Sequence, residues 1–237
     1  MHYPKAHNYD ALISSKIMGP NPVKLAEELL KDTCIAPGSV IMDLGSGQGL
    51  TSVFLAKEYG YTVYAADLWS DPSENMRFFR SEGLSEKEII PVHADATALP
   101  FAHEFFDGVV CLDSYNYFGR DESYLGEKLL PFVKHGGWIY ICIPGMKKDL
   151  HDRLPAELLA SWTPEQLDYI HDAAYWKNIL SKTEGLAGLE VFEMESNEEV
   201  WNDWLACENE YAAGDRKAFA CGGGKYLNFV GVVMQRA

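Results

Sequence analysis

Residues 40–49, Val-Ile-Met-Asp-Leu-Gly-Ser-Gly-Gln-Gly, decide the fold of this chain of 237 residues. A short apolar run that ends in a turn signal predicts a buried strand. The three glycines allow a tight turn in which the backbone can approach a ligand closely. The dinucleotide fingerprint G-x-G-x-x-G would need its third glycine at position 50, where the chain has Leu50. The stretch therefore predicts a strand, a glycine turn at a ligand site and a helix, with a spacing that departs from that fingerprint.

Short apolar runs alternate with amphipathic segments over most of the chain. Six further runs are predicted to be strands: residues 62–66, 89–93, 108–112, 138–143, 191–195 and 226–234. The gaps between the early runs are long enough for crossover helices, which is typical of βαβ units. The pattern predicts an α/β protein with a mostly parallel sheet.

The segments outside this pattern predict a lid and a cap. Asn21 and Pro22 suit the start of a helix, and a long helical stretch follows Gly145. The capping-box sequence Thr163–Gln166 starts a predicted helix that places His171 near its middle. A single domain is expected in four parts: residues 1–36, an N-terminal lid and first helix; residues 37–145, the core; residues 146–187, an inserted helical cap; residues 188–237, the final strands with a helix between them.

Residues 40–49 resemble the first motif of the class I S-adenosylmethionine (SAM)-dependent methyltransferases, in which an acidic residue at the end of a strand precedes G-x-G-x-G. Three more motifs agree with the family: Asp67 at the end of the second strand, the pair Asp95-Ala96, and Phe106–Val109, which fits "F-D-x-V". Residues 134–137 read K-H-G-G where the family usually has K-P-G-G. The resemblance covers residues 38–145 and the final two strands. It implies a Rossmann-like seven-stranded sheet with helices on both faces and an inserted helical cap.

The resemblance also implies a cofactor, SAM, and a product, S-adenosylhomocysteine (SAH). Asp67 would accept hydrogen bonds from the ribose hydroxyls, and Asp95 with Ala96 would meet the adenine amino group. The cofactor-binding residues expected from the family motifs are Asp43, Gly45, Ser46, Gly47, Gly49, Asp67, Leu68, Asp95, Ala96 and Leu112.

The reaction expected is in-line methyl transfer to a small-molecule acceptor. Asp113, Tyr115 and Tyr117 follow the fourth strand, where the open edge of a parallel sheet places ligands. They are expected to face the acceptor together with His171, a side chain suited to act as a base near neutral pH. A solvated helical position is an alternative for His171 and for His151.

Charge and composition limit the classes of partner. Twenty Lys and Arg against 35 Asp and Glu give a formal net charge of −15, which opposes binding to nucleic acid or to an anionic membrane. Eight acidic residues lie between positions 190 and 210, without Lys or Arg. Such a run usually forms a solvated helix face, although together with Trp201 and Trp204 it could instead attract a cationic acceptor.

Other sequence features favour a protein of the reducing cytoplasm. The five cysteines include no C-x-x-C pair, and no histidines have the spacing of metal ligands, so neither a disulfide framework nor a metal is expected. No apolar run is long enough for a membrane span, and a secretory signal is absent. Two other functions stay open: a non-catalytic SAM-binding module and a nicotinamide-dependent oxidoreductase. The oligomeric state is not predicted.

Overall fold

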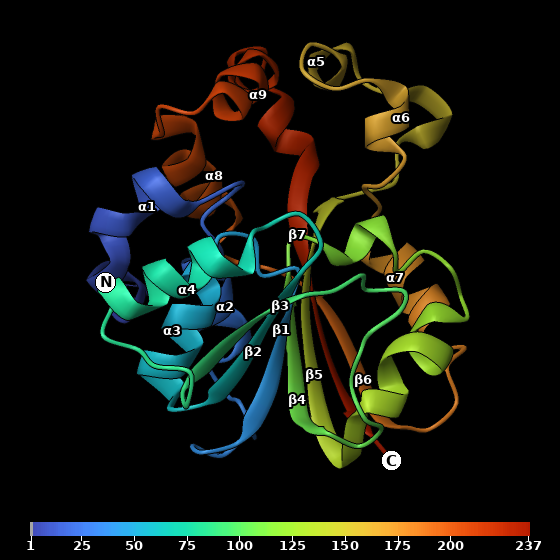
Figure 1. The fold of residues 1–237 in the computed structure, drawn as a ribbon. Coiled ribbons are helices and arrows are strands. Elements are labelled where there is room, and N and C mark those ends of the chain that lie inside the picture. Colours follow the sequence, from blue (N-terminus) through green and yellow to red (C-terminus); the bar gives the residue numbers. More distant parts are fainter. Residues whose placement is uncertain (1) are drawn as a thin grey trace.

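A computed structural model describes residues 2–237 and shows a seven-stranded sheet between two layers of helices (Figure 1). The strands are β1 (Val40–Leu44), β2 (Thr62–Asp67), β3 (Ile89–His93), β4 (Phe106–Leu112), β5 (Val133–Met146), β6 (Leu186–Glu193) and β7 (Leu227–Arg236). Their order is β3-β2-β1-β4-β5-β7-β6. Strands β1 to β5 are parallel, and β7 is antiparallel to both β5 and β6. The predicted fold class is confirmed.

The helices cover both faces of the sheet. They are α1 (Asp10–Lys16), α2 (Pro22–Leu29), α3 (Leu50–Tyr59), α4 (Pro72–Ser81), α5 (Ala156–Leu159), α6 (Pro164–Leu167), α7 (Ala173–Leu180), α8 (Asn197–Ala206) and α9 (Glu210–Ala220). One apolar core joins the sheet to α2, α3, α4 and α8, and the other joins it to α7 and the short turns before β5. In Figure 1, α5, α6 and α9 lie beyond the strand ends, above the edge where β1 and β4 finish.

The predicted helix through His171 is interrupted, which corrects the sequence interpretation. The capping box at Thr163 is present, but α6 ends after one turn at Leu167. Asp172 is extended and caps the next helix by accepting a hydrogen bond from the Tyr175 amide. His171 therefore lies between two helices, where its backbone carbonyl accepts a hydrogen bond from Met146 at the end of β5. The spacing of apolar residues alone predicts one continuous helix, but the hydrogen bond to the Asp172 side chain starts a new helix at this point.

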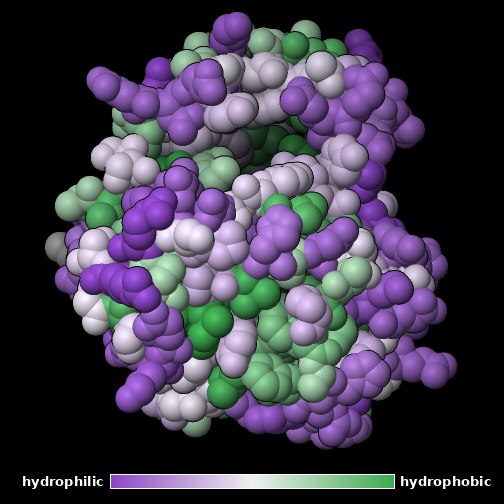
Figure 2. Space-filling model, viewed as in Figure 1, coloured by the Kyte–Doolittle hydropathy of each residue, from purple (hydrophilic) through white to green (hydrophobic). Residues whose placement is uncertain are grey.

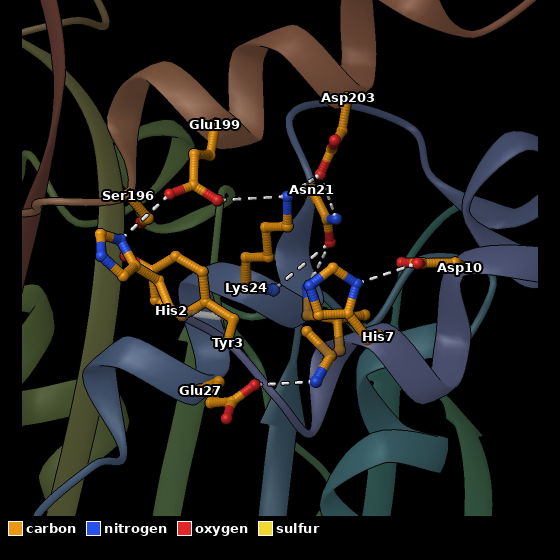
Figure 3. Close-up of polar contacts among 12 residues, drawn as sticks. His2, Tyr3, His7, Asp10, Asn21, Lys24, Glu27, Ser196, Glu199 and Asp203 are labelled. Atoms are coloured by element: carbon orange, nitrogen blue, oxygen red, sulfur yellow. Dashed lines mark hydrogen bonds and ion pairs between the residues drawn. The ribbon is translucent and has the colours of Figure 1, made fainter.

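The N-terminal segment is fastened to α8 through α2 (Figure 3). Lys24 is almost completely buried, and its Nζ lies 2.9 Å from Asp203 and 3.5 Å from Glu199. Asn21 caps α2 with its side-chain oxygen and donates from Nδ2 to Asp203 at 2.6 Å. Two members of the acidic run thus form structural ion pairs inside the protein.

The idea that Trp201 and Trp204 form an exposed aromatic rim with this acidic run is wrong. Trp201 is 9 % exposed and Trp204 is 1 % exposed, because α8 turns both indoles into the core beside β7. Within residues 2–237, no helix is both long and apolar enough to cross a membrane.

Candidate cofactor and acceptor site

A cavity of about 390 Å³ opens at the carboxyl edge of the parallel strands. Its wall comes from the ends of β1, β2 and β4, from the segment after β3, and from residues 16–22 of the N-terminal segment. Figure 2 shows a hollow with apolar side chains at its depth, below the overhang that α5, α6 and α9 form in Figure 1. This is the edge where parallel α/β sheets place their ligands.

The glycine turn after β1 has the backbone that the sequence requires. Gly45 has φ 78° and Gly49 has φ 83°, both in the left-handed region that favours glycine. A Cβ on Gly45 would lie 2.2 Å from the Ser114 hydroxyl oxygen, and one on Gly49 would lie 2.3 Å from the Phe79 ring. Gly45, Ser46 and Gly47 line the cavity, whereas Gly49 lies behind it as the N-cap of α3.

Asp67 connects this turn to the end of β2. Its Oδ2 accepts a hydrogen bond from the Gly47 amide at 2.9 Å, and its Oδ1 accepts from the amides of Trp69 and Ser70, each at 2.8 Å. The carboxylate lines the cavity and keeps acceptor capacity beyond these three bonds. Asn75 holds the other side of the turn by donating to the Gly47 carbonyl.

Asp43 supports the turn from below instead of lining the cavity. Its carboxylate is buried and accepts a 2.6 Å hydrogen bond from the Ser52 hydroxyl. Burial is the main cause that raises the pKa of Asp43 to about 7, and the charge of Asp67 adds to it. Ser46, by contrast, lines the cavity, and its buried hydroxyl has no hydrogen-bond partner among the described residues. Such an orphaned polar atom fits a cavity that receives a polar ligand.

The far end of the cavity combines a carboxylate with apolar side chains. Asp95 uses one oxygen, Oδ1, to accept from both the amide and the hydroxyl of Thr97, which lowers its pKa and leaves Oδ2 free of protein hydrogen bonds. Leu68, Ala96 and Leu112 also line the wall. The residue types suit a flat, partly apolar ring with an amino group at its edge.

Large apolar side chains gather at the mouth of the cavity although they are exposed to solvent. Met18, Leu68, Trp69 and Tyr117 are 58 %, 43 %, 77 % and 56 % exposed, and all four line the cavity. The rings of Trp69 and Tyr117 meet edge to face at 6.0 Å. Exposed apolar side chains that converge on one opening are typical of a ligand site.

Asp113 lies where β4 ends, with its side chain toward the cavity. Its φ of 55° is in the left-handed region, one of only two such non-glycine residues among residues 2–237. Desolvation raises the pKa of Asp113 to about 7, and the charge of Asp215 on α9 adds to the effect. No group of the described residues donates a hydrogen bond to this carboxyl group or pairs with it.

Two of the residues expected to face the acceptor do not line the cavity. Tyr115 is fully buried, and its ring packs edge to face against Trp176 and Tyr124. His171 is 8 % exposed and stacks on Tyr175 with 3.5 Å between ring centroids. In the single 3-10 turn Tyr115–Tyr117 the two tyrosine rings point in different directions, so that Tyr115 enters the core and Tyr117 reaches the mouth.

His171 instead belongs to a cluster with Asp149 and His151. The Nδ1 atom of His151 lies 2.6 Å from Asp149, and that of His171 lies 3.4 Å from it. The ion pair and hydrogen bonds raise the pKa of His151 despite partial burial and hold the pKa of Asp149 at about 2. Desolvation lowers the pKa of His171. The cluster joins the loop after β5 to the break between α6 and α7.

The sequence analysis missed the part of the site built by distant segments. The wall also includes Lys16, Ile17, Met18, Gly19, Pro20 and Pro22. The glycine and proline signals at positions 19–22 marked a helix start, but nothing in them indicated contact with the turn after β1. Asp215 was equally invisible, because only the placement of α9 brings it within electrostatic reach of Asp113.

Comparison with known proteins assigns this architecture to a family. The sequence profile of a methyltransferase domain matches residues 42–141, which carry the glycine turn, Asp67 and Asp113. The chain contains a class I methyltransferase domain. The match ends within β5, so the N-terminal segment and helices α5 to α9 lie outside the conserved methyltransferase core.

Two curated relatives are methyltransferases. The chain is 28 % identical over 119 residues to methyltransferase GfsG of Streptomyces halstedii, covering 50 % of this chain and 42 % of that protein. It is 38 % identical over 112 residues to demethylmenaquinone methyltransferase of Clavibacter sepedonicus, covering 46 % of this chain and 43 % of that one. The matched segments thus span less than half the length of these relatives.

Among solved structures, a Haemonchus contortus phosphoethanolamine N-methyltransferase in complex with phosphomonomethylethanolamine and SAH is similar in fold. The TM-score is 0.73 at 18 % identity, and the match covers 98 % of this chain and 56 % of that one. At this identity the likeness shows the fold alone, and that likeness extends over 98 % of this chain, beyond residues 42–141.

Proposed function

We propose that the chain is an enzyme that transfers a methyl group from SAM to a small-molecule acceptor, leaving SAH. The observation that supports it most is the convergence of the Gly45–Gly49 turn, Asp67, Asp95 and the orphaned Ser46 hydroxyl on one cavity inside a methyltransferase domain. The relatives named above are methyltransferases, and the structural neighbour binds SAH and a small acceptor.

The cofactor residues act by binding and orienting. The Gly45–Gly47 backbone would face the methionine part of the cofactor, Asp67 would accept from the ribose hydroxyls, and Asp95 with Ala96 and Leu112 would hold the adenine. SAM supplies an electrophilic methyl group on its sulfonium. The residues at the mouth, Met18, Trp69 and Tyr117, would limit the access of water and hold the acceptor in line, which is the main source of rate in a displacement of this kind.

Placement supports Asp113 and Tyr117 more than the other two residues expected to be catalytic. Both line the cavity beside the acceptor side of the cofactor position. Tyr115 and His171 lie behind the wall, where they would position Tyr117 and the end of β5 without touching the acceptor.

The test is incubation of the purified protein with SAM carrying a labelled methyl group and a metabolite extract. We expect a small labelled product from the wild type and none from Asp67→Ala. A wild type that binds SAM but transfers no label to any fraction would favour the alternative, a SAM-binding module without catalysis. The nicotinamide alternative predicts a change in NADH fluorescence on mixing, which we do not expect from a chain with Leu50 in place of the third glycine.

A further inference from the structure

Most carboxylates around the cavity accept hydrogen bonds from protein groups, whereas the Asp113 carboxylate accepts none. Asp43 accepts from Ser52, Asp67 from three amides and Asp95 from Thr97. Asp113 is partly buried, and a carboxylate that is partly removed from water without a partner is costly, so its place at the cavity wall indicates a partner that arrives with a ligand.

The backbone keeps the Asp113 side chain at this point. Its left-handed conformation is unusual for a residue with a side chain and stores strain of the kind found at functional sites. A Cβ on Gly19 would lie 2.4 Å from Asp113 Oδ2, so the N-terminal segment passes directly against the carboxylate. Only a glycine allows so close an approach without displacing the acid.

The charge of a second carboxylate, that of Asp215, acts on Asp113 and helps to raise its pKa. Asp215 on α9 is half-buried, and its Oδ2 accepts a 2.9 Å hydrogen bond from Trp204 Nε1. The Ser161 hydroxyl fixes this part of α9 by donating to the Gly214 carbonyl and accepting from the Ala218 amide, each at 2.8 Å. No Lys, Arg or His of residues 2–237 forms an ion pair with Asp113 or Asp215.

Aromatic rings complete the surroundings. Tyr117 lies close enough for the charge of Asp113 to affect its hydroxyl, and Trp69 packs against the Tyr117 ring. Carboxylates beside the faces or edges of aromatic rings favour an organic cation, and the net charge of −15 raises the local concentration of cations near the surface.

We propose that the acceptor is a primary or secondary amine that enters as an ammonium ion and is held at Asp113, with the negative charge of Asp215 adding to its attraction. This inference rests on the proposed methyl transfer and narrows its substrate class. The ammonium gives one proton to the Asp113 carboxylate. The freed nitrogen lone pair then forms the new N–C bond while the C–S bond breaks, and its electron pair stays on the sulfur of SAH.

The test compares choline with 3,3-dimethylbutan-1-ol, which has a neutral carbon in place of the quaternary nitrogen. Choline carries a permanent charge and cannot accept a methyl group, so the experiment measures binding alone. Each compound is titrated by calorimetry into the SAH-saturated protein. We expect choline to bind at least tenfold more tightly than the neutral alcohol. Asp215→Asn and Asp113→Asn should each reduce choline affinity at least fivefold, and Glu190→Gln, an exposed acid on β6, should leave it unchanged.

The possible failures can be told apart. A protein that binds SAH but treats the two compounds alike overturns the ammonium site and leaves the proposed methyl transfer standing. A protein that fails to bind SAH contradicts the proposed function, and the same pair of titrations without SAH then decides whether an ammonium site exists. If Asp113→Asn weakens SAH and leaves choline binding intact, Asp113 serves the cofactor, and the inference is wrong. Retained SAH affinity in Asp215→Asn shows that a loss of choline binding is not caused by unfolding.

Discussion

The site has two proposed halves, one for the cofactor and one for the acceptor, and the fold assembles them in different ways. The cofactor half comes from neighbouring turns at one sheet edge, and its acids accept hydrogen bonds from nearby amides and hydroxyls. The proposed acceptor half is assembled from residues 16–22 and the end of β4; its acid, Asp113, accepts no hydrogen bond, and Asp215 of α9, whose charge acts on Asp113, accepts one from Trp204. The first half is pre-formed for a known type of ligand, whereas the second half is left electrostatically incomplete, as expected where the ligand supplies the missing charge.

The largest loss of stability should come from a substitution in the glycine turn of the cofactor half. We expect Gly49→Ala to lower the free energy of unfolding by about 3 kcal/mol, because a side chain at φ 83° is strained and its Cβ would overlap the Phe79 ring. Gly188→Ala is the control, since nothing lies within 4 Å of the added Cβ, and its effect should stay within about 0.5 kcal/mol. Urea unfolding measures both. Equal effects would mean that the turn is less constrained than its geometry indicates.

A smaller loss of stability is expected when the ion pairs that anchor the N-terminal segment to α8 are removed. Lys24→Met should destabilise the protein by about 1 to 2 kcal/mol, because it leaves Asp203 and Glu199 without their buried cation. It should also weaken SAH binding, since residues 16–22 line the cavity. The matched control is Lys57→Met, whose more exposed pair with Glu82 should cost less than about 0.5 kcal/mol. Unchanged SAH affinity in Lys24→Met would separate this segment from the cofactor half.

Because the Asp113 carboxyl group has no partner in the protein, the stability of the protein is predicted to depend on pH. The pKa of Asp113 is raised to about 7 in the folded protein, so the folded state holds more protons than the unfolded state between about pH 4 and pH 7. Stability is therefore lost as pH rises through this range. Asp113→Asn should raise the free energy of unfolding by about 1 kcal/mol more at pH 8 than at pH 5. A gain that is the same at both values would show that Asp113 has a partner.

The smallest change in stability is expected from the cluster of Asp149, His151 and His171, which joins the cap to β5. Its ion pair raises the pKa of His151, so the contribution is complete below about pH 6.5 and is lost as pH rises through the folded value. His151→Gln should therefore cost about 0.5 kcal/mol more at pH 6 than at pH 8.5, a modest figure because the pair is partly exposed. Thermal unfolding at the two pH values measures it. A larger cost at the higher pH would contradict the assignment of the charge.

Sequence reasoning succeeded where the backbone itself imposes residue types. The glycine turn, Asp67 and Asp95 follow from local needs of a strand-to-helix turn, and eight of the ten expected cofactor residues line the cavity. Asp43 and Gly49 instead support the turn from behind. The seven strands were also predictable from their apolar runs, and the family resemblance implied a mostly parallel sheet.

The acceptor half could not be predicted in the same way, because tertiary packing decides it. The apolar period between Thr163 and Ile179 does not reveal that Asp172 ends one helix and begins another, so His171 was misplaced. Packing also decides which face of α8 meets β7, and the sequence does not show that Trp201 and Trp204 lie on that buried face. The close approach of Gly19 to Asp113 and the effect of the Asp215 charge on Asp113 join segments whose spacing in sequence carries no signal.

Calorimetric titration of SAM into the wild type and into Asp67→Ala tests the central claim most directly. The account predicts one site per chain with a micromolar dissociation constant in the wild type, and an affinity at least tenfold lower in the variant, or a loss of about 1.4 kcal/mol. No binding of SAM to the wild type, or undiminished binding to Asp67→Ala, would contradict it.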